Sequence, residues 1–165
     1  MTATIRILGI DPGLRHTGWG VVEQTGARLA HVAHGVISVD TTMEMAARLA
    51  GIFTAVAEIA RLHAPHAAGI EETLVNANPR SALKLGQARG AAMAALSLAS
   101  LPVAEFAPRK IKLSVVGTGT ADKDQVMFMV KRLLPRAGEM KADAADALAC
   151  AICAAESWYG VQRPQ

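Results

Sequence analysis

The 165-residue chain has little that would connect it to a membrane or to an export route. No stretch reaches the ~18 uninterrupted apolar residues that a membrane span requires, although hydrophobic residues make up 52% of the sequence. The first ten residues, MTATIRILGI, lack the basic start, apolar run and small-residue cleavage site of a secretory signal. We therefore expect a cytoplasmic protein with no membrane partner.

Cysteine and aromatic residues are also scarce. The two cysteines, Cys150 and Cys153, form a C-x-x-C pair, which is compatible with a redox site or with half of a zinc site. They lie in the Ala-rich stretch DALACAICAAE, with no second Cys or His pair nearby in the sequence, so we interpret them as small buried thiols. Aromatic residues make up 4% of the chain, and we interpret Trp19 and Trp158 as packing residues.

Positive charge is concentrated in one part of the chain. Residues 80–141 hold 11 of the 17 Lys and Arg residues but only four of the 14 Asp and Glu residues, so this segment carries a net charge of +7. The whole chain carries a formal charge of +3. The asymmetry favours a polyanion as partner, with a solvated basic surface of no function as the alternative.

The apolar pattern predicts strands first, and then helices that alternate with strands. Strands are expected over 4–10, 18–24, 28–39, 67–71 and 102–107, and helices over 43–63, 79–100, 109–117, 123–134 and 142–158. This order predicts an α/β fold: a five-stranded mixed sheet, formed by a three-strand antiparallel meander plus two parallel strands, with helices on both faces. We expect a single domain over residues 1–165, in which residues 158–165 form a frayed tail.

Two predicted strands end on a carboxylate. Asp11 ends the stretch ILGID, directly before Pro12 and Gly13, and Glu71 ends AAGIE. In open α/β sheets, binding and catalysis take place at the carboxyl ends of the strands, so these two acids would lie side by side if their strands are neighbours. Alternation along the strand favours Glu71 over the adjacent Glu72, because successive strand residues point to opposite faces.

The last predicted helix adds two further acids. Asp143 and Asp146 are three residues apart, which puts both side chains on one helix face. Four converging carboxylates would repel one another, and a divalent cation would resolve the conflict. Oxygen ligands suit Mg²⁺ or Mn²⁺, and a pair of such ions ~4 Å apart supports phosphodiester hydrolysis. Each acid alone has an ordinary explanation in a turn, a strand end or a helix start, so the hypothesis depends on their combination.

Five stretches of the sequence resemble one known family. They are ILGIDPGLRHTGWGVV, IEE, NPRSALKLGQARG, VVGTGTADKDQV and ADAADALA, and they extend over about residues 5–157. They resemble the RuvC crossover junction endodeoxyribonucleases, bacterial resolvases of four-way (Holliday) DNA junctions with an RNase H-like fold. The resemblance implies that the metal-binding catalytic acids are Asp11, Glu71, Asp143 and Asp146. It also implies Mg²⁺ as the metal, with Mn²⁺ as a substitute and two ions in each active site.

The same resemblance implies a homodimer in which each subunit cuts one of two opposing DNA strands. The cuts leave a 5′-phosphate and a 3′-hydroxyl, in homologous recombination and DNA repair. Two sites related by a two-fold axis match a junction that is itself two-fold symmetric. RuvA and RuvB, the branch-migration proteins, are expected partners. The helix from Pro79 to Ser100 resembles the family's dimer element, although its small residues would also suit packing on the sheet: Ala88, Gly90, Ala91, Ala92, Ala94 and Ala95.

Basic residues of the central segment are the expected DNA contacts. Lys112 and Lys123 resemble the family's basic groups near the scissile phosphate, and Lys123, after the loop GTGTA, is included among the catalytic residues. Many members carry an aromatic residue a few positions after the catalytic Glu, whereas this chain has Leu74, which can wedge between bases but has no π-face for stacking. The other expected DNA contacts are Arg80, Lys84, Arg89, Arg109 and Lys110.

Two other function classes fit parts of the pattern. An actin-like or sugar-kinase-like ATPase domain has a similar Asp-x-Gly…Thr-Gly hairpin that holds phosphate, but it needs a second lobe that 165 residues cannot supply. A non-catalytic RNase H-like scaffold that binds structured nucleic acid would be expected to lack one of the four acids, and all four are present. The sequence therefore predicts a Mg²⁺-dependent, structure-selective junction endonuclease.

Overall fold

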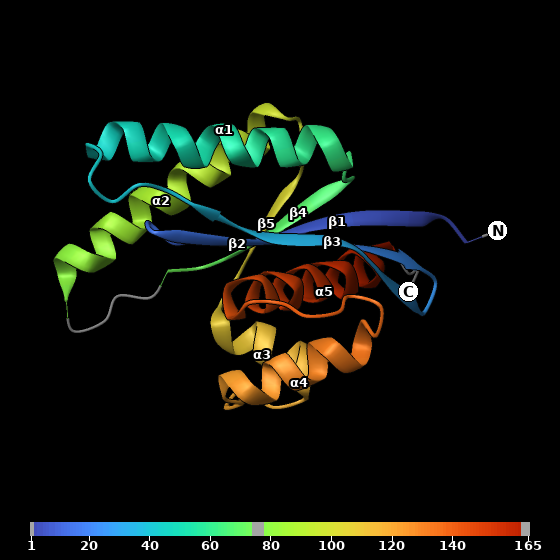
Figure 1. Cartoon of the computed structure of the whole chain (residues 1–165). Helices are drawn as coiled ribbons and strands as arrows, with labels where there is room; N and C mark the ends of the chain where they lie inside the picture. Colours follow the sequence, from blue (N-terminus) through green and yellow to red (C-terminus); the bar gives the residue numbers. More distant parts are fainter. Residues whose placement is uncertain (1, 74–77, 163–165) are drawn as a thin grey trace.

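The computed structural model contains a five-stranded sheet with helices on both faces, and it describes residues 2–73 and 78–162 (Figure 1). The strands are β1 (Thr4–Asp11), β2 (His16–Thr25), β3 (Arg28–Ser38), β4 (Ala67–Glu71) and β5 (Val103–Phe106). The helices are α1 (Met45–His63), α2 (Pro79–Leu98), α3 (Pro108–Val116), α4 (Lys123–Leu133) and α5 (Ala142–Gln162).

The strand order places β1 at the centre of the sheet. The order is β3-β2-β1-β4-β5, with antiparallel pairing from β1 to β2 and from β2 to β3, and parallel pairing from β1 to β4 and from β4 to β5. Helices α1 and α2 cover one face, and α5 covers the other, with α3 and α4 packed on the far side of α5 (Figure 1). The predicted fold class is therefore confirmed.

Side-chain alternation along β1 and β4 divides the core between the two faces. Leu8 and Ile10 of β1 and Ile70 of β4 pack in the cluster that contains α1 and α2. Ile7 and Ala67 pack in the opposite cluster, with α3, α4 and α5. The same alternation directs the last residue of each strand toward α5. The strand ends therefore present their carboxylates to the helix that carries the other two acids.

Helix α5 lies very close to the sheet because glycines face it. A Cβ on Gly9 would stand 2.1 Å from the carbonyl oxygen of Ala147, and a Cβ on Gly18 would stand 1.9 Å from the carbonyl oxygen of Asp143. The helix surface that meets them is built largely from fully buried alanines, such as Ala147 and Ala151. Close packing of this kind fixes the first turns of α5 against the ends of β1 and β2.

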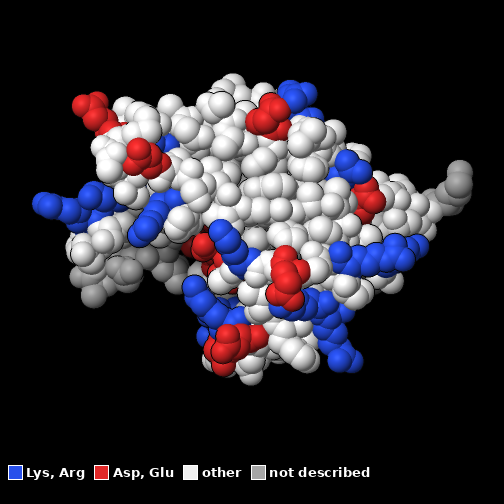
Figure 2. All heavy atoms as spheres, in the orientation of Figure 1, with Lys and Arg blue, Asp and Glu red and all other residues white. Residues whose placement is uncertain are grey.

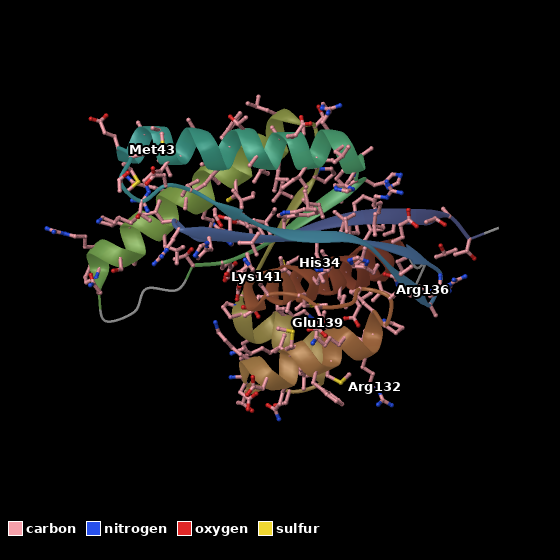
Figure 3. The ribbon with its side chains drawn as sticks, in the orientation of Figure 1. His34, Met43, Arg132, Arg136, Glu139 and Lys141 are labelled. Carbon is pink, nitrogen blue, oxygen red and sulfur yellow. The ribbon has the colours of Figure 1, made fainter. Side chains whose placement is uncertain are left out.

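The loop before α5 is connected to β3. The Nε2 atom of His34 donates a hydrogen bond to the carbonyl oxygen of Glu139 over 3.2 Å, and Lys141 follows just before the helix (Figure 3). The Glu139 carboxylate accepts from the Lys131 ammonium of α4 over 3.4 Å. The start of α5 is thus held from both the sheet and α4.

The C-terminal helix is longer than expected. It continues to Gln162, so the prediction of a frayed tail is wrong for residues 158–162, while residues 163–165 lie outside the described residues. Trp158 packs against the core cluster beneath it, and the first proline after it is Pro164, so nothing ends the helix at Trp158. Both thiols of α5, Cys150 and Cys153, are free and buried, as predicted.

The small residues of α2 divide between two environments. Ala88, Ala92 and Ala95 are buried in the core cluster that α2 shares with α1 and the sheet, as the packing alternative predicts, and Ala91 is half-buried beside them. Gly90 and Ala94 are exposed. Within the described part of the chain, no helix is long and apolar enough to cross a bilayer.

Candidate active site

Asp11 and Glu71 stand next to each other at the ends of two parallel strands. Ile10 and Ile70 are paired in the β1–β4 register, so the residues that follow them end neighbouring strands at one edge of the sheet. Burial, a hydrogen bond that the protonated Asp11 carboxyl donates to the Glu71 carboxylate, and the charges of Glu71, Asp146 and Asp143 raise the pKa of Asp11 to about 9. The carboxyl of Asp11 is therefore protonated at neutral pH unless a cation replaces the proton.

Asp143 and Asp146 lie in the first two turns of α5, on the side that faces the strand ends. Burial raises the pKa of Asp146 to about 6; the nearby charge of Lys123 opposes the shift, and those of Glu71 and Asp143 add to it. The Lys123 ammonium lies 3.9 Å from the Asp146 carboxylate. Asp143 is half-buried, and its charge acts on both Asp11 and Asp146. The four acids thus form one electrostatically coupled group.

A cleft of about 200 Å³ contains three of the acids and faces two lysines. Lys112 comes from α3 and Lys123 from the first residue of α4, so both enter the cleft from helices packed outside α5. Figure 2 shows Asp and Glu atoms set back between Lys and Arg side chains, near the boundary between the sheet and the helices below it in Figure 1, α3, α4 and α5. The lining residues are Asp11, Glu71, Pro108, Ile111, Lys112, Lys123, Val126, Asp146 and Ala149.

The donor set suits a hard divalent cation. It consists of carboxylate oxygens, which are the ligands that Mg²⁺ and Mn²⁺ prefer. The raised pKa values of Asp11 and Asp146 indicate that burial and the neighbouring carboxylates disfavour the charged form of these two acids when no cation is bound. As the side chains lie, however, no three His, Cys, Asp or Glu residues among 2–73 and 78–162 form a ready-made cage around one point. Asp11 and Glu71 hydrogen-bond to each other instead, and Asp146 pairs with Lys123. A cation would have to replace these two contacts.

The turn after Asp11 is closed by Thr17, a residue that the sequence alone does not mark as functional. The hydroxyl of Thr17 donates to the carbonyl oxygen of Gly13 over 2.7 Å and accepts from the amide of Gly13 over 3.2 Å. The side chain is 1% exposed. The available sequence signal is the Thr-Gly step of the DPG…TG hairpin, which resembles a phosphate-binding hairpin and does not by itself indicate a turn-closing threonine. In the structure it fixes the path of the chain between Asp11 and β2.

The remaining predicted basic residues fall into different environments. Arg80 and Lys84 are exposed on α2, Arg109 and Lys110 are exposed on α3, and Leu74 lies outside the described residues. Arg89 is different, because its guanidinium forms an ion pair with Glu105 and donates to the carbonyl oxygen of Glu71 over 3.1 Å. Four of these five basic side chains therefore face solvent, and one is engaged within the protein.

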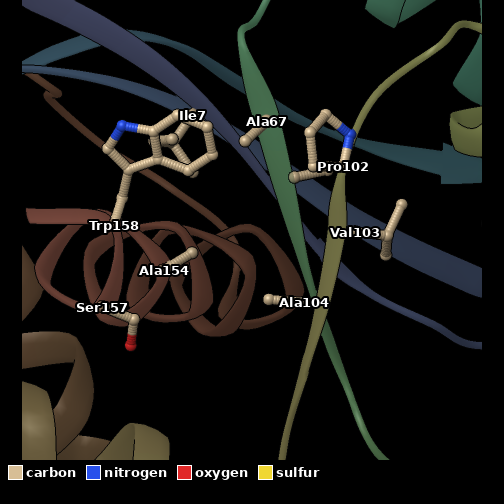
Figure 4. A pocket seen from close by; sticks show the side chains of 9 residues that line it. Ile7, Ala67, Pro102, Val103, Ala104, Ala154, Ser157 and Trp158 are labelled. Carbon is tan, nitrogen blue, oxygen red and sulfur yellow. The ribbon is translucent and has the colours of Figure 1, made fainter. Parts of the chain in front are cut away.

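A larger apolar cavity lies at the opposite end of β4 and β5. It has a volume of about 340 Å³ and is lined by residues that include Ile7, Ala67, Pro102, Val103 and Trp158 (Figure 4). None of the described residues that line it is an acid or a base. The lining of this cavity offers no group for acid–base or metal chemistry, so the cleft at the strand ends is the candidate site.

The family model described as crossover junction endodeoxyribonuclease RuvC matches residues 7–154. The chain belongs to the RuvC family. It is 81% identical to the RuvC of Hyphomonas neptunium over 94% of this chain and 93% of that protein. It is 55% identical to the RuvC of Granulibacter bethesdensis over 92% of this chain and 85% of that protein.

A solved RuvC structure has the same fold. T. thermophilus RuvC in complex with a Holliday junction substrate superposes with a TM-score of 0.87 at 30% identity, over 98% of this chain and 99% of that one. The predicted family and enzyme class, crossover junction endodeoxyribonuclease, are thereby confirmed. Membership of this nuclease family also implies a divalent metal ion.

Proposed function

We propose that this RuvC-family chain is a Mg²⁺-dependent endonuclease that resolves four-way DNA junctions by paired, symmetric nicks. It leaves 5′-phosphate and 3′-hydroxyl ends and acts in homologous recombination and DNA repair in the cytoplasm. The observation that carries the proposal is the cleft in which half-buried carboxylates face Lys112 and Lys123. The junction substrate bound by the T. thermophilus relative supports the choice of DNA structure.

The four acids have one shared role in this proposal, which is to hold Mg²⁺ at the strand ends. Two bound ions would supply an activated water and stabilisation of the leaving oxygen, with Mn²⁺ as a substitute. Asp11 and Glu71 offer ligands from the rigid sheet, and Asp143 and Asp146 offer them from α5. The high pKa of Asp11 means that the cation displaces a proton when it binds near neutral pH.

The lysines act on the phosphate. Lys123 is 82% exposed, so its ammonium is able to leave Asp146 and neutralise the scissile phosphate as charge develops on it. Lys112 lines the same cleft from α3 and contributes positive charge there. The exposed side chains of Arg80, Lys84, Arg109 and Lys110 extend the basic surface for the DNA backbone. Leu74 remains a proposed contact at the junction centre.

A homodimer matches the two-fold symmetry of a junction, and α2 is the helix proposed to join the subunits. Its outer face carries Leu83 and Leu98, which are 72% and 77% exposed. Between them, a Cβ on Gly86 or Gly90 would meet no other described atom within 4 Å. Such a face allows a second helix to approach closely. RuvA and RuvB are the proposed partners in branch migration.

The decisive experiment uses a four-way junction assembled from labelled synthetic oligonucleotides. With Mg²⁺, the wild-type protein should nick two opposing strands at symmetric positions, and DNA ligase should reseal the nicks. Asp11→Asn should lower the cleavage rate by at least about 100-fold, because it removes an anionic ligand. Its affinity for the junction in EDTA should stay within about threefold, because the basic surface is unchanged.

Glu71 and Glu72 provide a matched pair of variants. Glu71→Gln should behave like Asp11→Asn, whereas Glu72→Gln should cleave like the wild type, because the Glu72 side chain is exposed beyond the strand. Equal loss in both variants would contradict the assignment of Glu71. Junction binding by a wild-type protein that makes no nicks would instead favour a non-catalytic scaffold, and equal cleavage of linear duplex would favour a general nuclease.

A further inference from the structure

The Arg89 side chain connects α2 to the end of β4. Its Nε atom donates to the backbone carbonyl oxygen of Glu71 over 3.1 Å, and its Nη2 atom forms an ion pair with Glu105 of β5. The Arg89 side chain is 17% exposed, and that of Glu105 is 46% exposed. One guanidinium thus contacts the backbone of an acidic residue of the cleft and a carboxylate on the neighbouring strand.

These contacts constrain the direction of the Glu71 side chain. A charge-assisted hydrogen bond to a carbonyl fixes the peptide plane, and the peptide plane of Glu71 sets where its Cα–Cβ bond points. The amide of Glu72 donates to the carbonyl of Phe106 over 2.8 Å, so the peptide bond after Glu71 is held from β5 as well. Glu105 orients the guanidinium, whose planar fork presents donors in two directions at once.

We infer that Arg89 is a positioning residue, which holds the end of β4 so that Glu71 faces Asp11, and that it is not a DNA contact. The inference rests on the proposed function, in which Glu71 helps to hold the cation. Glu105 belongs to the same device, because it keeps the Arg89 guanidinium aligned with the Glu71 carbonyl. Neither residue touches the substrate in this assignment.

Two variants that remove charges of opposite sign distinguish a positioning role of Arg89 from a role as a DNA contact. Arg89→Gln removes a positive charge and Glu105→Gln removes a negative one, so a purely electrostatic effect on DNA or on a cation must have opposite signs in the two proteins. Loss of positioning must instead have the same sign in both. Arg89→Lys keeps the charge but loses the planar fork, so it should recover only part of the function.

The experiment measures Mn²⁺ binding to the DNA-free protein by electron paramagnetic resonance, together with the Mg²⁺ dependence of junction cleavage. Arg89→Gln and Glu105→Gln should both weaken Mn²⁺ binding by about tenfold, as removal of groups behind metal ligands commonly does. Both should also raise the Mg²⁺ concentration for half-maximal cleavage. Lys84→Gln, an exposed charge on the same helix, should weaken junction binding and leave Mn²⁺ binding unchanged.

The opposite results would overturn the inference. Unchanged Mn²⁺ affinity in Arg89→Gln, with weaker junction binding and a smaller salt dependence, would make Arg89 a DNA contact. Unchanged Mn²⁺ affinity with only a lower melting temperature would make it a purely structural residue. A wild-type protein that binds Mn²⁺ but does not cut junctions would refute the proposed function, and the comparison of Mn²⁺ affinities would still decide the role of Arg89.

Discussion

At the level of single residues, burial and neighbouring negative charges both disfavour ionisation of the Asp11 carboxyl. The side chain ends a buried strand and hydrogen-bonds to Glu71, and its pKa rises to about 9. In the unfolded chain the same group has a pKa near 3.8. In the absence of a cation, the Asp11 carboxyl of the folded protein therefore stays protonated across the physiological pH range.

This difference predicts how the stability of the metal-free protein depends on pH. Between about pH 4 and 9 the folded state binds more protons than the unfolded state, so the free energy of unfolding should fall as pH rises, by on the order of a few kcal/mol. Urea unfolding in EDTA at several pH values measures the slope. Asp11→Asn, which cannot titrate, should flatten it, and saturating Mg²⁺ should flatten it in the wild type. Equal slopes for wild type and variant in EDTA would contradict the prediction.

Residue identity predicted some of the site and missed the rest. The types and the strand or helix positions of the four acids predicted that they converge, and the resemblance to the family added the two lysines. The structure brings all six residues together. The roles of Thr17 and Arg89 were missed because both act through hydrogen bonds to backbone carbonyls. Such contacts depend on which carbonyl the folded chain presents, and residue type does not reveal this.

At the level of elements, α5 depends on the glycines of the sheet for its position. A methyl group on Gly18 would stand 1.9 Å from the Asp143 carbonyl oxygen, which no side-chain rotation relieves, because the clash is with backbone. The helix must then shift away from β2, and Asp143 must move with it. Gly9 of β1 and Gly18 of β2 are thus part of how the acids of α5 reach the strand ends.

Gly18→Ala should therefore destabilise the protein and impair cleavage together. We expect a loss of about 1–3 kcal/mol in the free energy of unfolding, as for overpacking in a core, with a cleavage rate at least about tenfold lower in a protein that is still folded. Gly51→Ala in α1 is the matched control, because its Cβ would meet its nearest neighbour, a methyl carbon of Val39, at 3.5 Å. Chemical denaturation and junction cleavage assays check both variants, and a fully active, stable Gly18→Ala protein would contradict this account of α5.

Apolar periodicity predicted the elements well and their ends less well. The strands and helices follow in the expected order, but α1 begins at Met45 rather than Met43, and α5 continues past Trp158 to Gln162. Helix ends depend on local caps and on tertiary contacts. Trp158 packs against the core, and the helix continues beyond it. Apolar periodicity does not reveal such a tertiary contact, so it did not predict the four further residues of α5.

At the level of the whole molecule, α2 has one face inside the subunit and one outside. Ala88, Ala92 and Ala95 are buried in the core cluster shared with α1 and the sheet, while Gly86 and Gly90 are exposed. Glycine in the middle of a helix costs roughly 0.5–1 kcal/mol relative to alanine. Two such residues on one exposed face weaken the isolated subunit, and close approach of a second α2 is a reason for them in the proposed dimer.

Replacing these glycines should have opposite effects on the subunit and on the dimer. Gly86→Ala/Gly90→Ala should raise the intrinsic stability of the helix by about 0.5–1 kcal/mol per site, because a Cβ at either site meets no other described atom within 4 Å. The same methyl groups should separate the two helices and raise the dimer dissociation constant by at least about tenfold. Sedimentation velocity over a range of concentrations measures the dissociation, and unfolding of the diluted protein measures the subunit, with Gly51→Ala as the helical control. A dimer of unchanged affinity would place the subunit contact elsewhere, and a monomeric wild type would refute the dimer itself.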